Sequence, residues 1–302
     1  MKTVRTIAEL RDALAPDRRA GRTIGLVPTM GALHDGHLSL MLHAREQCDV
    51  VVVSLFVNPT QFNEATDLAG YPRDEATDTR LAAETGANYL FAPSAAEIYP
   101  DGFVTTVAVE ALTERLEGAQ RGRSHFDGVT TVVAKLLNIV GPDRAYFGQK
   151  DAQQAAVIRR MVRDLEIPVE LVVSPTVREP DGLAMSSRNA HLSPAERRRA
   201  VALYRSLRAA ERAVDDGERD ADAVVEAARR ELTEVDPEYF ELVDPDSFAP
   251  VRGRIDGDVL AVVAARVGTT RLIDNHTIAV PTTAHAVGSA DPEEALTCSA
   301  RC

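Results

Sequence analysis

Two kinds of apolar pattern alternate over the first 173 residues. Continuous apolar runs such as 49–57 are typical of strands buried on both faces of a parallel sheet. Apolar residues spaced three and four apart, clearest over 129–140, are typical of amphipathic helices. Strands that alternate with helices in this way predict a doubly wound, Rossmann-like α/β sheet. The predicted strands are 23–27, 49–57, 88–91, 104–109, 144–147 and 169–173, and the predicted helices are 6–20, 38–45, 74–85, 129–140 and 153–165.

The alternation ends near Val177. Ser193, followed by proline and then by Glu196, forms the capping box of a helix that continues through Val214, and a second helical stripe covers 224–232. Short apolar strands follow, and helices before a small sheet predict a smaller α+β domain. These three strands are expected at 239–243, 259–265 and 271–274. We therefore expect a Rossmann-like domain at 1–176, an α+β lid domain at 177–281, and a loose tail without periodicity at 282–302.

A glycine-containing loop between a predicted strand and helix carries His34 and His37. Two glycines and a proline within 28–36 mark a tight loop. A helix start presents free N–H groups and the positive end of the helix dipole, which suits a phosphate, and glycines let the backbone approach it. Two such histidines could also form half of a metal site or be ordinary solvated residues. Metal-binding pairs on helices usually stand four residues apart, so we favour phosphate contact.

The overall charge and composition narrow the classes of partner. The 302 residues carry a formal net charge of −12, which argues against a basic surface for nucleic acid. A small anionic substrate is compatible, because local Lys and Arg residues dominate the field inside a cleft. No apolar run has the length of a membrane span, and no secretory signal follows Met1. Cys48, Cys298 and Cys302 have neither disulfide nor zinc spacing, so we expect a cytoplasmic protein.

Two further strand ends carry polar side chains. Asn58 and Gln61 follow a buried strand, and their amides can read a hydroxyl and a carboxylate together. An Asx turn before proline would also explain Asn58. Residues 148–154 follow the predicted strand 144–147, where Lys150 offers a point charge for phosphate and Gly148 an unhindered backbone. An ordinary turn capped by Asp151 would explain the same sequence.

The segment 175–189 stands between the two expected domains. Met185, Ser186, Ser187 and Arg188 place two hydroxyls and a guanidinium there. Arginine can hold a phosphate through two parallel hydrogen bonds. Composition alone is equally compatible with a polar interdomain linker.

These motifs, in this order, resemble those of the pantothenate synthetase (pantoate–β-alanine ligase) family. Residues 28–37, PTMGALHDGH, are similar to the family signature, in which HDGH is the form taken by the HIGH box of adenylylating nucleotidyltransferases. Residues 56–62 resemble the VNPxQF segment, and 185–189 the MSSRN form of the KMSKS-like loop. Residues 148–154 resemble GEKDxxQ, with Gln149 where glutamate is usual. The resemblance covers 1–281.

The resemblance implies the positions of the binding residues. ATP contacts are implied at Met30, Gly31, His34, His37, Gly148, Lys150, Asp151, Val177, Met185, Ser186, Ser187 and Arg188. Pantoate contacts are implied at Asn58, Gln61 and Gln154, with Gln61 also placed to meet β-alanine. The family's R-P-G-H-F arginine matches either Arg121 or Arg123, because this chain lacks the proline and has one extra residue there.

The implied reaction has two steps. The pantoate carboxylate attacks the α-phosphate of ATP to give pantoyl adenylate and pyrophosphate, and the β-alanine amine then displaces AMP to give pantothenate. His34 and His37 would contact the phosphates, with His37 as proton donor, while Lys150 and Arg188 stabilise developing charge. Mg²⁺ would accompany ATP, with Asp78 as an outer ligand. The family also implies a homodimer, without nucleic-acid or membrane partners.

Three other functions are compatible with parts of the pattern. A cytidylyltransferase-like enzyme also uses an HxGH loop but leaves the nucleotide in its product. An aminoacyl-tRNA synthetase would need a tRNA-binding surface, which this acidic chain lacks. A non-catalytic module would bind ATP and release nothing. The pair Asn58 and Gln61 favours the ligase over all three.

Overall fold

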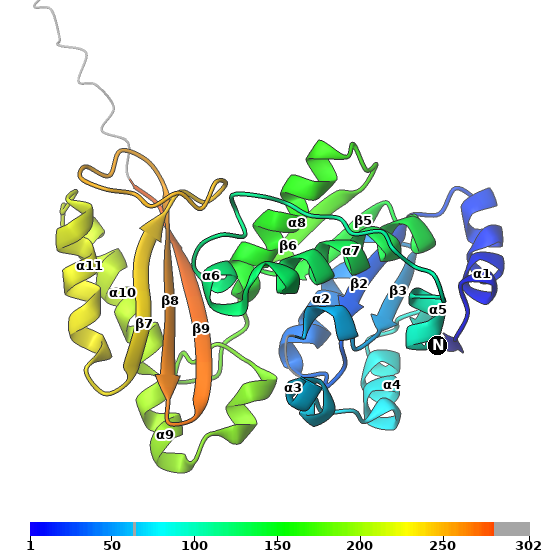
Figure 1. The fold of residues 1–302 in the computed structure, drawn as a ribbon, viewed down its shortest axis with the longest axis horizontal. Helices are drawn as coiled ribbons and strands as arrows, with labels where there is room; N and C mark the ends of the chain where they lie inside the picture. The colour runs from blue at the N-terminus through cyan, green and yellow to red at the C-terminus, as the bar shows by residue number, and fades with distance from the viewer. Residues whose placement is uncertain (63–64, 281–302) are drawn as a thin grey trace, which may run out of the picture.

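Two sheets organise the chain in the computed structural model, which describes residues 1–62 and 65–280 (Figure 1). The predicted tail at 282–302, with Cys298 and Cys302, lies outside the described residues. The larger sheet is parallel in the order β1-β4-β3-β2-β5-β6, with β1 Lys2–Val4, β2 Ile24–Thr29, β3 Val50–Leu55, β4 Tyr89–Phe91, β5 Arg144–Gly148 and β6 Glu170–Ser174. The smaller sheet is antiparallel in the order β7-β8-β9, with β7 Asp236–Val243, β8 Val259–Val267 and β9 Thr270–Ile278.

Alternate residues of the central strands explain why the parallel sheet is covered on both faces. Val50 and Val52 of β3 join one apolar cluster, with residues of α1, α7 and α8, whereas Val51 and Val53 join another, with residues of α2 and α4. Successive strand side chains point to opposite faces, so a run of valines buries both. These helices are α1 Ile7–Arg19, α2 Asp35–Gln47, α4 Glu75–Glu84, α7 Arg123–Val140 and α8 Ala152–Asp164, and shorter ones are α3 Ala65–Gly70, α5 Ala95–Ile98 and α6 Glu117–Arg121. The predicted doubly wound fold is confirmed.

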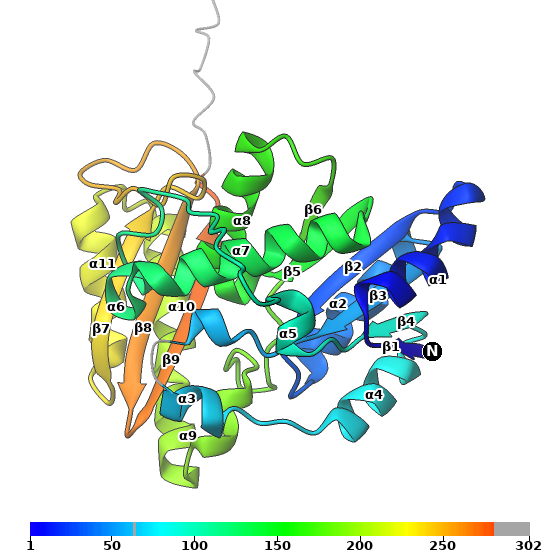
Figure 2. The same cartoon turned by 45° about the vertical axis from the view of Figure 1, so that its right-hand side comes forward.

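The antiparallel sheet has a core of its own and a second apolar face. Helices α10 (Ala202–Asp215) and α11 (Ala221–Arg229) pack on one face. On the other face, Val243, Leu260 and Val262 pack against Leu116 and Phe126, which lie just before α6 and in α7. Helix α6 and the first turn of α7 thus reach the second sheet, while the rest of α7 runs along the parallel sheet (Figure 2).

Two predictions about local structure needed correction. Residues 104–109 form no strand, because no neighbouring strand is there to pair with them. Val107 instead bonds through its N–H to Thr131 Oγ1 of α7, and Val104 is 90% exposed. The predicted continuous helix from Ser193 divides at Val201 into α9 (Pro194–Ala200) and α10, although the capping box of Ser193 and Glu196 is present.

The strand order determines where a ligand can bind. In the parallel sheet, β2 is central, with β3 on one side and β5 on the other, so the chain reverses its winding direction between β2 and β5. Ligands of doubly wound sheets bind at such a switch point, at the carboxyl ends of the strands. The histidine loop follows β2 and the Lys150 turn follows β5, so the fold brings both to this point.

Candidate active site

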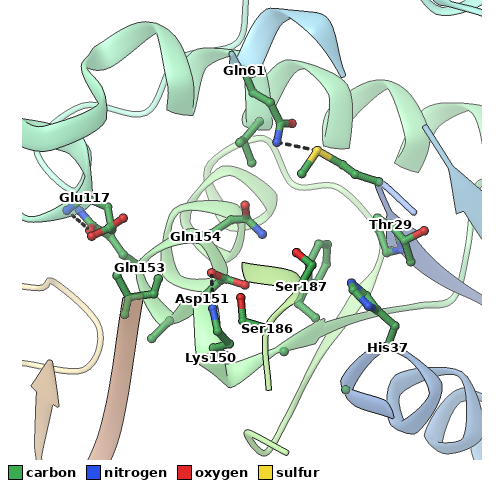
Figure 3. Close-up of a pocket in the computed structure, with 18 of the residues that line it drawn as sticks. Thr29, His37, Gln61, Glu117, Lys150, Asp151, Gln153, Gln154, Ser186 and Ser187 are labelled. Atoms are coloured by element: carbon green, nitrogen blue, oxygen red, sulfur yellow. Dashed lines mark hydrogen bonds and ion pairs between the residues drawn. The ribbon is translucent and has the colours of Figure 1, made fainter. Parts of the chain in front are cut away.

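A cleft at the carboxyl ends of the parallel strands gathers nearly all the predicted site residues (Figure 3). In the close-up, His37, Gln61, Lys150, Gln154 and the two serines of 186–187 surround one space. The predicted residues that line it are Met30, His34, His37, Asn58, Gln61, Gly148, Lys150, Asp151, Gln154, Val177, Met185, Ser186, Ser187 and Arg188. Gly31 and Asp78 do not line it.

The two histidines cap the helix that starts at the cleft. His34 is the N-cap of α2, and its Nδ1 accepts a hydrogen bond from Gly36 N at 3.1 Å. His37 stands at the third helical position and its Nδ1 accepts from His34 N, so the rings lie 4.2 Å apart between centroids. Because the helix begins at Asp35, both rings face the cleft as predicted. Each Nδ1 accepts a backbone N–H, which leaves Nε2–H as the donor of the neutral ring.

Burial keeps both rings uncharged in the free protein. Loss of hydration is the main cause that lowers the pKa of His37 to about 3, with smaller contributions from His34 and Lys150. The pKa of His34 is lowered for the same first reason and by Lys150. Near neutral pH the site therefore presents two uncharged N–H donors beside one ammonium group. An anionic phosphate would raise both pKa values and draw a proton onto the histidines.

Asp78 braces the histidine loop from behind. Its two carboxylate oxygens accept the N–H groups of Ala32 at 3.0 Å and Leu33 at 2.8 Å, and the residue is 3% exposed. Gly31 has φ +88°, and a Cβ there would stand 2.8 Å from the Asp78 carboxylate. The loop geometry therefore requires glycine at this position, and the implied ATP contact of Gly31 stays a prediction. Asp78 thus has a structural role in the loop, and the expected outer contact with Mg²⁺ stays a prediction.

The turn after β5 points a lysine into the cleft. Gln149, Lys150 and Asp151 form a single 3-10 turn before α8. The Lys150 side chain is 18% exposed, and its Nζ lies 3.7 Å from Asp151 Oδ1. Gln154, one turn into α8, faces the same space (Figure 3). A flexible cation beside two histidine donors is a suitable arrangement for a polyphosphate.

The amide pair after β3 is built as a unit. Asn58 is 1% exposed, and its Nδ2 donates to Gln61 Oε1 at 3.1 Å and to Gly128 O at 3.0 Å. Its Oδ1 accepts from Tyr99 Oη at 2.8 Å. Asn58 is thus engaged by the protein and orients Gln61, whose Nε2 lies 2.9 Å from the Met30 sulfur. Gln61 is the member of the pair whose amide can turn toward a substrate.

The polar loop at 185–188 forms part of the cleft rim. Met185 N donates to Val177 O at 3.0 Å, so the loop folds back on the segment that leaves β6. Ser186 Oγ accepts from Arg188 N and caps the short turn Ser187–His191, which leaves Arg188 at the cleft edge. A guanidinium on a short loop can move toward an anion that enters the cleft.

A buried ion-pair network joins α6 to the second sheet. Glu117 accepts two hydrogen bonds from Arg271, at 2.6 and 2.8 Å, one from Tyr239 Oη at 2.8 Å and one from Arg121 Nε at 3.1 Å. Burial opposes the charge on Glu117, but these partners outweigh it and lower its pKa to about 2. The network places Arg121 in the cleft wall.

Arg123 does not reach the cleft. Its guanidinium bonds Glu110 at 3.0 Å, lies 3.7 Å from Asp127 and is 62% exposed. Of the two arginines that the sequence left open, the structure therefore brings only Arg121 together with the predicted site.

Several cleft residues had no local sequence signal. Their partners lie far away in the chain, so neither period nor spacing could connect them. The cleft residues not predicted from sequence include Glu117, His125, Gln153, Tyr239, Phe248, Asp274 and Asn275. Family resemblance gave a signal without a role at two places: His125 stands at the histidine of the R-P-G-H-F segment, and residues 268–275 are also similar to the family's sequence.

Two kinds of feature are absent from residues 1–62 and 65–280. No helix within these ranges has the length and apolar character needed to cross a bilayer. No group of three or more His, Cys, Asp or Glu side chains within them is arranged to hold a metal ion.

Comparisons with known proteins agree with this geometry. The family model described as pantoate-beta-alanine ligase matches residues 2–277. Pantothenate synthetase from Moorella thermoacetica is 54% identical over 278 residues, covering 91% of this chain and 98% of the relative. Pantothenate synthetase 1 from Bradyrhizobium diazoefficiens is 55% identical over 276 residues, covering 91% and 97%.

Solved structures extend the likeness to three dimensions. A crystal structure of pantothenate synthetase from Thermus thermophilus has a TM-score of 0.85 and 48% identity, covering 91% of this chain and 99% of that one. Pantoate-beta-alanine ligase from Francisella tularensis, complexed with beta-gamma ATP and beta-alanine, has a TM-score of 0.73 and 33% identity, covering 91% and 97%. The chain therefore belongs to the pantoate-beta-alanine ligase family.

Proposed function

We propose that this protein joins pantoate to β-alanine at the expense of ATP, through a pantoyl-adenylate intermediate, and releases AMP and pyrophosphate. One observation carries the proposal: a single cleft is lined by two histidine donors, a lysine, the loop 185–188 and the amide side chains of Gln61 and Gln154. The first three groups suit the phosphates of ATP, and the amides suit a hydroxy acid. Family membership and the ATP and β-alanine of the Francisella complex support the same assignment.

In the first step the protein positions two reactants and stabilises charge. A carboxylate is a poor acyl donor to an amine, and transfer of AMP to it provides a good leaving group. Gln61 and Gln154 would hold pantoate so that its carboxylate approaches the α-phosphate in line. Nε2–H of His34 and His37 and the ammonium of Lys150 would meet the charge that develops on the phosphate oxygens. Because nearby phosphate raises its pKa, His37 would supply a proton to the departing pyrophosphate.

Arg188 and Val177 would complete the nucleotide site. Arg188 stands on its short loop at the rim and would close over the phosphates, together with the hydroxyls of Ser186 and Ser187. Val177, tied to this loop through Met185 N, would pack at the adenine. Met30 and the backbone of Gly148 would complete the contacts.

Mg²⁺ fits this site as a companion of the nucleotide. The described residues offer no cluster of three ligand side chains, which suits an ion that keeps its waters and is held mainly by phosphates. Such an ion would neutralise phosphate charge. In the second step the β-alanine amine attacks the acyl carbon, and AMP leaves.

Three further proposals concern the whole protein. The separate apolar cores suggest domains at 1–176 and 177–281. Family resemblance suggests a homodimer. Cysteine usage and the biosynthetic reaction suggest the cytoplasm.

Release of AMP and pyrophosphate from ATP tests the proposal, with pantoate and β-alanine supplied separately and together. AMP should require both substrates, and pyrophosphate should form alongside it. Pyrophosphate formed with pantoate but without β-alanine-dependent AMP would indicate a different acceptor. ATP binding without any product would refute the ligase.

A further inference from the structure

Asn275 of β9 commits its side-chain amide to the turn that carries Lys150. Its Nδ2 donates to the carbonyl oxygens of Gln149 and Lys150, each at 2.9 Å, and its Oδ1 accepts from Gln149 Nε2 at 3.1 Å. Asn275 is 4% exposed, so these bonds are shielded from water. Both amide hydrogens of Asn275 serve one turn of a distant part of the chain, 125 residues earlier in sequence.

Asp274, the residue before Asn275 in β9, holds the segment that leads to the loop 185–188. Arg178 donates two hydrogen bonds to the Asp274 carboxylate, at 2.6 and 3.0 Å, and a third to Asn275 O at 3.3 Å. Arg178 directly follows Val177, on the segment that leads to the loop 185–188. Two consecutive residues of the antiparallel sheet therefore fix the backbone of the lysine turn and the base of the rim loop.

The backbone of Lys150 is the part of this residue that the protein can hold firmly. The side chain has four flexible methylenes, and its resting contact with Asp151 is long, at 3.7 Å. Charge stabilisation in a transition state depends on donors already held in place. A tilt of the 3-10 turn would move the ammonium group relative to the histidines across the cleft.

We propose that Asn275 is a positioning residue for adenylate formation, which acts by fixing the backbone of Lys150. The inference rests on the proposed function and on the role given there to Lys150. It differs from a purely structural role, in which the same bonds would only join the two sheets and stabilise the fold. The two roles make different predictions once Lys150 itself is removed.

The test is a double-mutant cycle on the full chain, read by pantoate-dependent exchange of pyrophosphate into ATP. Asn275→Ala should lower the exchange rate at saturating ATP about 10- to 100-fold, the size expected when a catalytic group is misplaced by roughly 1 Å. The KM for ATP should change much less than the rate. In a Lys150→Met background, Asn275→Ala should have little further effect, because residues that act as a unit are not additive.

Matched variants separate positioning from stability. Asn275→Asp keeps the shape but puts an acceptor against both carbonyl oxygens, so the exchange rate should fall at least as far as in Asn275→Ala. Gln149→Ala leaves both carbonyl bonds in place and should cost less. Asn88→Ala is the control, because Asn88 also bonds a distant strand, through Val51 N at 2.8 Å, but does not line the cleft. It should lower Tm with no change in exchange rate in either background.

Each outcome bears on a separate claim. Full additivity of Asn275→Ala and Lys150→Met, with normal exchange in the unsubstituted protein, would overturn the positioning role alone. A rate that falls only in proportion to the folded fraction at the assay temperature, read from the thermal unfolding curve, would also overturn it. An unsubstituted protein without pantoate-dependent exchange would overturn the proposed function and this inference together.

Discussion

Replacing Asp78 by alanine should disable the enzyme by releasing the histidine loop. The carboxylate of Asp78 accepts two backbone N–H groups, one of them from Ala32, which adopts the left-handed φ of +52°. Hydrogen bonds to a charged acceptor contribute about 1.5 to 3 kcal/mol each, so loss of both should cost roughly 3 to 6 kcal/mol. For a chain of this size that corresponds to a Tm lower by roughly 5 to 15 °C.

Turnover should fall with stability but for a separate reason. The loop places His34 and His37, so its release would misplace both donors, and kcat should drop about 100-fold for a displacement of roughly 1 Å. Thermal unfolding and AMP release measure the two effects in parallel. Asp74→Ala is the matched control. Asp74 caps α4, the helix that contains Asp78, by accepting a hydrogen bond from Thr77 N at 3.1 Å, and it lies outside the cleft. Asp74→Ala should lower the free energy of unfolding by about 1 kcal/mol and leave kcat unchanged.

The same experiment tests the alternative role as an outer Mg²⁺ contact. If Asp78 braces the loop, Asp78→Ala should respond to Mg²⁺ as the unsubstituted protein does. An unchanged Tm, together with activity restored by raised Mg²⁺, would refute the brace and support the metal contact.

Three further predictions concern other parts of the cleft. His37→Gln should flatten the dependence of stability on pH between about 6.5 and 3, as measured by urea unfolding. The pKa of His37 is about 3 in the folded protein and near 6.5 in the unfolded chain, so only the unfolded chain binds the proton in this window. The unsubstituted protein therefore loses stability as pH falls from 6.5 toward 3. Glu117→Gln should lower the free energy of unfolding by about 3 to 5 kcal/mol at neutral pH, because Arg271 loses a buried partner. This difference in stability from the unsubstituted protein should vanish as pH falls from 4.5 toward 2, where Glu117 itself becomes protonated. An unchanged urea midpoint at pH 7 would contradict this. Asn58→Ala should raise the KM for pantoate through the freed Gln61, and an unchanged KM would argue against that orientation.

The sequence predicted those elements whose burial follows a local rule. The valines of β3 signal a strand buried on both faces, and the spacing within 129–140 signals a helix with one buried face. The histidine loop was recognisable because strand, glycines and helix start lie within a few residues. Strand β1 was missed because it has three residues and only Val4 is buried.

Residues that depend on distant partners could not be predicted in this way. Glu117 meets Arg271 across 154 residues, and Asn275 meets Lys150 across 125. Each sits in a stretch whose local pattern is that of an ordinary surface or strand. The strand predicted at 104–109 was wrong although its local composition favours a strand. These residues pair with no strand, and Val107 N donates to Thr131 of α7 instead.

The apolar contact between the two sheets limits how far the cleft can open. Val243, Leu260 and Val262 of one sheet share an apolar cluster with Leu116 and Phe126 of the other half. Any swing that parts them brings water onto both surfaces, at about 25 cal/mol for each Å² of apolar area. Uncovering on the order of 200 Å² would cost about 5 kcal/mol, which opposes the opening motion. Substrate entry should therefore proceed by movement of the loop at 185–188, with this apolar contact kept closed throughout the catalytic cycle.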